Sequence, residues 1–227
     1  MLLLIKFIFL LIHLFIISDC RIISNKYDFL NDIKDKKETF HIQNIFSVDD
    51  VNTIEIISSK FYLTGNSNDE SELNLLNSRL IFKNECHTIE IKNITITGIL
   101  EFENNKNVIF DHVRYNGSFL SNNKDGDLNP SLQIANSEFR LSEQYQGIEI
   151  LNNNVDINNS TFFGNHHYNL FLMKVSGQKN VMNSTLNIND SLFSGNYHNG
   201  GIESSYTNIT CTYTKFENFY SGRKLNR

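Results

Sequence analysis

The chain has 227 residues, of which 40% are hydrophobic, and its 20 Lys and Arg against 25 Asp and Glu give a formal net charge of −5. This balance, without any basic stripe, argues against nucleic acid as a partner. The length is sufficient for one domain with its own hydrophobic core.

The first 20 residues have the pattern of a secretory signal peptide. Lys6 precedes an apolar stretch from Phe7 to Ile17, and Ser18 and Cys20 suit the small positions before a cleavage site. The apolar stretch is shorter than the roughly 20 residues that span a membrane. We therefore expect cleavage before Arg21, a secreted or extracellular surface protein, and no membrane span in the mature chain. An uncleaved signal anchor is the alternative.

Residues 21–50 are predicted to cap the fold. Tyr27, Phe29, Leu30 and Ile33 follow one another at roughly helical spacing, close to the densest run of charges in the chain. A short amphipathic helix here would cover the first coil of a solenoid, whose end otherwise exposes its core and a strand edge.

From residue 51 onward, one hydrophobic frame recurs eight times. Apolar residues lie seven and five positions before a large apolar anchor, and Asn, Asp, Ser, His or Tyr lies three positions before it. The anchors are Phe61, Leu80, Ile96, Tyr115, Phe139, Phe162, Phe193 and Phe216. They follow one another at about the length of one coil of a parallel β-helix.

Alternation with period two is typical of strands that bury one face. The polar residues three positions before the anchors can bond the backbone at a corner and, stacked at roughly 4.8 Å, form a ladder. They are Ser58, Asn77, Asn93, His112, Asn136, Asn159, Asp190 and Tyr213. The later coils add a second strand, which includes Ile148, Phe171, Ile202 and Leu225.

We therefore predict an all-β chain: a single-stranded parallel β-helix, or solenoid, of about eight coils over residues 51–227. It has a short N-terminal helical cap and no cap at its C-terminal end. Phe162 should point into the core between Phe139 and Phe193, and Phe163 should point outward, because adjacent strand residues face opposite ways.

The later coils resemble the repeats of polymorphic outer-membrane proteins. Residues 159–165 and 190–196 each contain Phe-x-x-Asn, and Gly200-Gly201-Ile202 is similar to the Gly-Gly-x-Ile element of those repeats. The match covers roughly residues 130–222, whereas the earlier coils share only the hydrophobic frame. The resemblance implies a right-handed, pectin-lyase-like β-helix, with surface display and adhesion more often than catalysis.

Two cysteines remain once the signal is removed. Cys86 precedes the third copy of the frame and Cys211 belongs to the eighth, so roughly five strand spacings, about 24 Å, separate them. This exceeds the Cα separation of about 7 Å that a disulfide allows. We expect no disulfide.

Seven Asn-x-Ser/Thr sequons accompany the signal. Asn93 and Asn159 lie at predicted corners, where an oligosaccharide transferase is least able to reach them. We predict glycosylation at the other sequons: Asn116, Asn158, Asn183, Asn189 and Asn208.

A catalytic β-helix needs carboxylates on one outward face. The positions six residues before the anchors are Glu55, Asn74, Glu90, Ile109, Gln133, Asp156, Asn187 and Thr210. Those four residues before them are Ile57, Leu76, Lys92, Asp111, Ala135, Asn158, Asn189 and Thr212.

In these two stripes, only Glu90 and Asp111 approach the separation of about 5–10 Å that glycoside hydrolysis requires. With Lys92 beside them and Arg114 at the corner, they form the one low-ranking catalytic candidate: acids that hold Ca²⁺ and an Arg or Lys base. A solvated salt-bridge cluster is the more ordinary interpretation.

Two further groups of residues are candidates for sites, one of histidines and one of tyrosines. His166, His167 and His198 do not supply the three or four convergent ligands of a metal site, and we predict neither metal nor cofactor. An edge strip of Tyr145, Tyr168, Tyr197 and Tyr220 would suit the stacking of sugar rings, with Asn side chains bonding hydroxyls. Packing of these tyrosines against loops is the alternative.

The leading hypothesis is a non-enzymatic extracellular protein for surface adhesion or carbohydrate binding, with a carbohydrate or a cell-surface protein as partner. The first alternative is a polysaccharide lyase or glycoside hydrolase acting on acidic polysaccharide through Glu90, Asp111 and Arg114. The second is a truncated fragment of a receptor ectodomain. The uncapped C-terminal coil also predicts end-to-end association.

Overall fold

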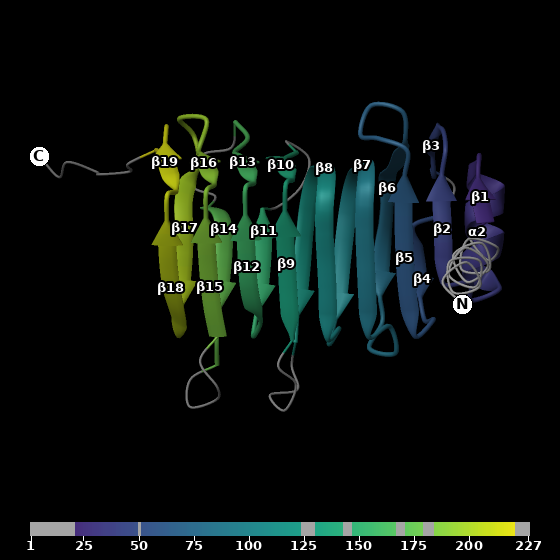
Figure 1. Cartoon of the computed structure of the whole chain (residues 1–227), viewed down its shortest axis with the longest axis horizontal. Coiled ribbons are helices and arrows are strands. Elements are labelled where there is room, and N and C mark those ends of the chain that lie inside the picture. The colour runs from purple at the N-terminus through teal and green to yellow at the C-terminus, as the bar shows by residue number, and fades with distance from the viewer. Residues whose placement is uncertain are drawn as a thin grey trace, which may run out of the picture.

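The computed structural model describes residues 21–49, 51–123, 130–142, 147–166, 171–178 and 184–220. They form a parallel β-solenoid of about eight turns with one short helix (Figure 1), which confirms the predicted fold class. The right-handed sense implied by the resemblance stays a prediction.

Each complete coil has three strand faces, named A, B and C in chain order. Face A contains β1 (Arg21–Ile23), β2 (Thr39–Ile42), β5 (Lys60–Gly65), β9 (Ser131–Ala135), β12 (Asn154–Asn158), β15 (Ser184–Asn189) and β18 (Thr207–Thr212). Face B contains β3 (Ile45–Ser47), β10 (Glu138–Leu141), β13 (Thr161–Phe163), β16 (Leu192–Ser194) and β19 (Lys215–Glu217).

Face C contains β4 (Thr53–Ile56), β11 (Ile148–Leu151), β14 (Phe171–Ser176) and β17 (Gly200–Ser205). Three long strands turn corners without a break: β6 (Glu72–Phe82) covers faces B and C, and β7 (Thr88–Glu103) and β8 (Asn107–Asn122) each cover all three. We number the coils from coil 1 (β2, β3, β4) to coil 8 (β18, β19), with β7 as coil 3 and β8 as coil 4.

The core is built from columns of equivalent residues. On face B, Tyr115 pairs in register with Phe139, Phe139 with Phe162, and Phe162 with Phe193. The Phe162 ring lies 5.1 Å from that of Phe139 and 4.6 Å from that of Phe193, centroid to centroid. Phe162 is fully buried and Phe163 is not, so the predicted register of coil 6 is confirmed.

The first two copies of the hydrophobic frame do not align as predicted. Phe61 lies on face A opposite Ile89, whereas Leu80 lies on face C opposite Ile54. The anchors occupy one column only from Ile96 onward. All three corners interrupt the strand alternation in a similar way, so the spacing of apolar residues does not reveal which corner a copy of the frame crosses.

The solenoid also begins earlier than residue 51. β2 pairs with β5 and β3 with β6, so much of the predicted cap region already belongs to coil 1. The cap itself is the helix α2 (Lys26–Lys34), whose N-cap Asn25 accepts the amide N–H of Asp28 at 3.1 Å. Phe29 of α2 is fully buried, and its ring centroid lies 5.8 Å from that of Phe40.

The corner between faces A and B has one backbone conformation in six successive coils. Its residues are Asn93, His112, Asn136, Asn159, Asp190 and Tyr213, with φ between 46° and 54°. Asn and Asp tolerate this left-handed region better than most residues. Six of the eight predicted polar residues therefore lie at this one corner. Ser58 lies at the corner between faces C and A, where its Oγ donates to the Lys60 carbonyl, and Asn77 lies at the corner between faces B and C; neither has the left-handed φ.

Candidate ligand-binding face

A ladder of serines holds the A–B corner in a fixed register. The Oγ atoms of Ser137, Ser160 and Ser191 accept the amide N–H of Val113, Ser137 and Ser160, respectively, at 3.0, 3.2 and 3.1 Å. Each Oγ also donates to the carbonyl two residues earlier in its own coil. We did not predict this ladder, although its signal is visible: a serine directly follows the corner residue in coils 5, 6 and 7.

A second ladder runs along the solvent side of the same corner. Asp111 Oδ1 lies 2.8 Å from His112 Nδ1 and accepts Asn136 Nδ2 at 3.0 Å, and Asn136 Oδ1 accepts Asn159 Nδ2 at 2.8 Å. Partial burial raises the pKa of Asp111, but the hydrogen bonds from Asn136 and His112 outweigh it, so the pKa lies below its usual value. The predicted corner ladder therefore forms across coils 4 to 6.

The three catalytic candidates each hold a different partner. Glu90 forms an ion pair with Lys92 of its own strand, and Asp111 belongs to the corner ladder. Arg114 lies beyond the corner on face B, and its Nη1 is 2.9 Å from Asp69 Oδ1. None of the three bonds to either of the others.

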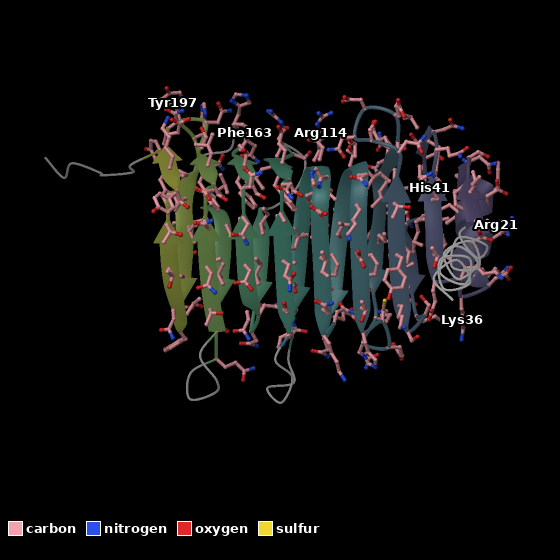
Figure 2. All side chains as sticks on the ribbon, in the orientation of Figure 1. Arg21, Lys36, His41, Arg114, Phe163 and Tyr197 are labelled. Atoms are coloured by element: carbon pink, nitrogen blue, oxygen red, sulfur yellow. The ribbon has the colours of Figure 1, made fainter. Side chains whose placement is uncertain are left out.

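The outward side of face A presents columns that run along the solenoid, as Figure 2 shows in stick form. In coils 1 and 2 these columns contain Thr39, Tyr62, His41 and Thr64, and not the predicted Glu55, Asn74, Ile57 and Leu76. From coil 3 onward the predicted stripes agree with the strand register.

The outward side of face A in coils 5 to 8 is lined mainly by amide and hydroxyl side chains, and we call this surface the polar grid. Its members are Ser131, Gln133, Asn154, Asp156, Asn158, Thr185, Asn187, Asn189, Asn208, Thr210 and Thr212. The one charged member is Asp156. The grid is therefore an almost uncharged hydrogen-bonding surface on consecutive parallel strands.

Hydrogen bonds between coils fix the side chains of the polar grid. Asn187 Nδ2 donates to Asp156 Oδ1 at 2.8 Å, and Thr212 Oγ1 donates to Asn189 Oδ1 at 2.6 Å. In a third column, Thr185 Oγ1 donates to Asn154 Oδ1 at 3.1 Å. These three bonds restrict the rotamers of six of the grid's residues, so those groups are ordered before any ligand arrives.

The structure describes two of the four tyrosines of the predicted strip. Tyr197 and Tyr220 have 68% and 45% of their surface exposed, and Tyr197 lies in the loop after β16, at the upper edge of Figure 2. Tyr145 and Tyr168 fall outside the described residues. The described half of the strip therefore lies off face A and does not join the polar grid.

The histidines of neighbouring coils do meet. The rings of His166 and His198 are 5.1 Å apart, edge to face, and His198 Nδ1 lies 2.6 Å from the carbonyl oxygen of Asn196. His167 lies outside the described residues. Among the described residues, no group of three or more His, Cys, Asp or Glu side chains has the arrangement of a metal site.

The two described cysteines, Cys86 and Cys211, are free thiols. Cys86 is fully buried, and burial raises its pKa to about 12, so this thiol is unreactive. Cys211 is exposed in β18 although its column is a core column in every earlier coil.

The five predicted glycosylation sites differ in their surroundings. Asn158 and Asn208 are exposed members of the polar grid and form no side-chain hydrogen bond with another described residue. The Asn189 amide donates a hydrogen bond to Asp190 and accepts one from Thr212. Asn116 is half-buried on face B. Asn183 falls outside the described residues.

Comparisons with protein families, curated proteins and solved structures find no match to this chain. The resemblance to polymorphic outer-membrane-protein repeats therefore stays a prediction. Within the described ranges, no helix has the length and apolar character needed to cross a membrane.

Proposed function

We propose that this chain is a non-enzymatic extracellular protein that binds an extended carbohydrate through the polar grid of face A. The observation that carries the proposal is the set of bonds between coils, such as Asn187 to Asp156, that orders amides and hydroxyls on consecutive strands. The signal-like N-terminus, the sequons and the resemblance to pectin-lyase-like adhesin repeats support the extracellular setting.

The chemistry of the grid suits sugar hydroxyls. Amide and hydroxyl groups both donate and accept hydrogen bonds, as sugar hydroxyls do. The rotamers of the six grid residues bonded between coils are already restricted, so their binding loses less side-chain entropy than it would on a mobile surface. Strands spaced by about 4.7–4.9 Å repeat the same groups along the axis, which allows a polymer to engage several coils at once.

The electrostatics of the grid favour a neutral polymer. Asp156 is its single charged side chain, and no Lys or Arg belongs to it. A polysaccharide rich in carboxylate or sulfate would find no cation there to offset the loss of its hydration. Neutral glycans should therefore bind better than acidic ones.

The test is a screen of the secreted protein against neutral and acidic polysaccharides, followed by calorimetry on the best binder. Asn187→Ala should weaken binding roughly two- to tenfold, since one hydrogen bond contributes about 0.5–1.5 kcal/mol. Ser205→Ala is the matched control, because Ser205 is a polar residue exposed on face C. Its affinity should equal that of the wild type.

Two results would contradict the proposal. One is the absence of binding to any polysaccharide by correctly folded protein. The other is full glycan occupancy of Asn158 or Asn208 in the natural protein, because a glycan there would cover the grid; under this proposal the glycosylation predicted at these two sequons does not occur. Peptide mapping by mass spectrometry measures that occupancy directly.

A further inference from the structure

Face A carries an aromatic side chain three coils before the polar grid. Among the described residues, Tyr62 is the one Phe or Tyr on the outward side of this face, and it is half-buried. Strands lie on both sides of it, because Tyr62 pairs with Thr39 of the preceding coil and with Glu90 of the following coil. Its exposure is therefore a property of the sheet surface and not of an end of the solenoid.

The strand register places Tyr62 in one column with the polar grid. From coil 1 to coil 8, this column contains Thr39, Tyr62, Glu90, Ile109, Gln133, Asp156, Asn187 and Thr210. The column runs across the strands that lie side by side in Figure 1, without a register shift. Five strand spacings, about 24 Å, separate Tyr62 from Asn187.

The polar side chains around Tyr62 are held in place. On the coil 1 side, His41 Nδ1 lies 3.0 Å from Thr64 Oγ1, and His41 Nε2 lies 3.0 Å from Asn66 Oδ1. On the coil 3 side, Glu90 forms an ion pair within its own strand. The Tyr62 side chain forms no hydrogen bond and no ring contact with another described residue. Ordered polar groups thus surround an aromatic ring that has no partner within the described part of the chain.

Apolar contact is what the polar grid itself lacks. A hydrogen bond from the grid to a sugar replaces hydrogen bonds to water, so its net contribution is small. A sugar ring also has an apolar surface of C–H groups, and an aromatic side chain with a polar tip suits such a ligand. Ile109, in the same column, adds a second apolar side chain between Tyr62 and the grid.

We propose that Tyr62 is a stacking subsite for the glycan that binds the grid, and that this glycan is a β-1,4-linked glucan or mannan. The inference rests on the proposed function of the grid. A chain linked through equatorial bonds is straight and flat, as the column is, with C–H groups on its faces and hydroxyls along its edges. Chains with α-linkages coil away from a flat surface. One straight chain contacts the Tyr62 ring and the grid at once, which strengthens binding without any change at either place.

A fluorescent reporter tests the subsite directly. The chain contains no Trp, so Tyr62→Trp introduces a single indole ring at this position. Its emission should shift to shorter wavelength when cellohexaose or mannohexaose is added, because the stacked sugar displaces water from the ring. Tyr27→Trp is the matched control: Tyr27 is an exposed tyrosine on α2, outside face A, and the emission there should not change.

Calorimetry measures the contribution of the ring. Tyr62→Ala should weaken binding of the hexasaccharide roughly five- to fiftyfold. Tyr62→Phe keeps the ring and should bind as the wild type does. Equal binding by Tyr62→Ala and the wild type, with unchanged circular dichroism, would overturn the proposal.

A second variant tests whether one glycan contacts both places. In the Tyr62→Trp protein, Asn187→Ala should raise the midpoint of the hexasaccharide titration roughly two- to tenfold. The same change should leave a titration with cellobiose unaltered, because a disaccharide is too short to span five strand spacings. An unchanged hexasaccharide midpoint would overturn the shared column.

The remaining outcomes separate this inference from the proposed function. If the emission does not shift while Asn187→Ala still weakens hexasaccharide binding by calorimetry, the Tyr62 subsite is overturned and the proposed function stands. The same holds for the β-1,4 assignment if the protein binds other neutral polysaccharides but neither hexasaccharide. If it binds no polysaccharide at all, both are overturned.

Discussion

The rings of Phe162 and Phe193 lie 4.6 Å apart, centroid to centroid, with their planes 5° from parallel. Phe139 and Phe216 continue this stack on either side, at 5.1 Å from Phe162 and 5.2 Å from Phe193. Rings stacked between neighbouring coils fix the spacing of those coils from inside, as the serine ladder does at the corner. A substitution of one ring should therefore disturb the packing of the coils on both sides of it.

Replacing Phe162 with Ala should destabilise the protein by about 3–5 kcal/mol, because the cavity lies between two rings that strand pairing holds in place. Little folded protein should then be secreted. Phe163→Ala is the control: its ring lies outside the core and contacts the guanidinium of Arg140 at 4.3 Å. It should lose about 0.5–1 kcal/mol. Equal losses in urea unfolding at the two positions would contradict the stacking argument.

Removing one hydroxyl of the serine ladder tests the corner. Ser160→Ala deletes an acceptor for the Ser137 amide and a donor to the Asn158 carbonyl, both on the buried side of the strand. An unsatisfied buried backbone group costs about 1–3 kcal/mol. We expect a loss in that range by urea unfolding. Thr161→Ala, at the next and more exposed position, should lose less than about 0.5 kcal/mol.

Much of this fold could be predicted because a solenoid repeats one local pattern. The alternation of apolar residues identified the strands, and the polar residue before each anchor identified six left-handed corners. The assignment of copies to corners could not be predicted, since Ile54 and Leu73 have the same local pattern but lie on faces C and B. Only pairing between distant strands distinguishes them.

The candidate site could be predicted only where it follows from the repeat. Asn187 and Asp156 share a column because their strands are in register, and the predicted stripes contained both. The partner of Arg114 could not be predicted, because Asp69 lies in an irregular loop two coils away, before β6. That ion pair gives Arg114 a partner outside the predicted catalytic set.

The corner ladder should make stability depend on pH. The folded-state pKa of Asp111 lies below its ordinary value of 3.8, so the ionised carboxylate stabilises the fold. This contribution is fully present above the unfolded value and is lost as the pH falls through the lower, folded value. Urea midpoints measured from about pH 5 down to pH 2 should fall less steeply for Asp111→Asn than for the wild type. Identical slopes would contradict the assignment.

Two strand glycines provide a matched test of how closely the coils approach. Gly117 pairs in register with Gly98 of the preceding coil, and a Cβ atom on Gly117 would lie 1.9 Å from the Gly98 carbonyl oxygen. The backbones must separate to admit it, and the pairing of β7 with β8 would weaken. At Gly201, a Cβ atom would approach nothing closer than the Phe219 ring at 3.8 Å.

Gly117→Ala should therefore destabilise the protein by about 3 kcal/mol, at the upper end of the range for overpacking. Gly201→Ala should change stability by less than about 1 kcal/mol, since it adds ordinary contact with Phe219 and lowers the entropy of the unfolded chain. Urea unfolding of both variants measures the difference. A Gly117→Ala protein as stable as Gly201→Ala would mean that β7 and β8 do not approach as closely as their register requires.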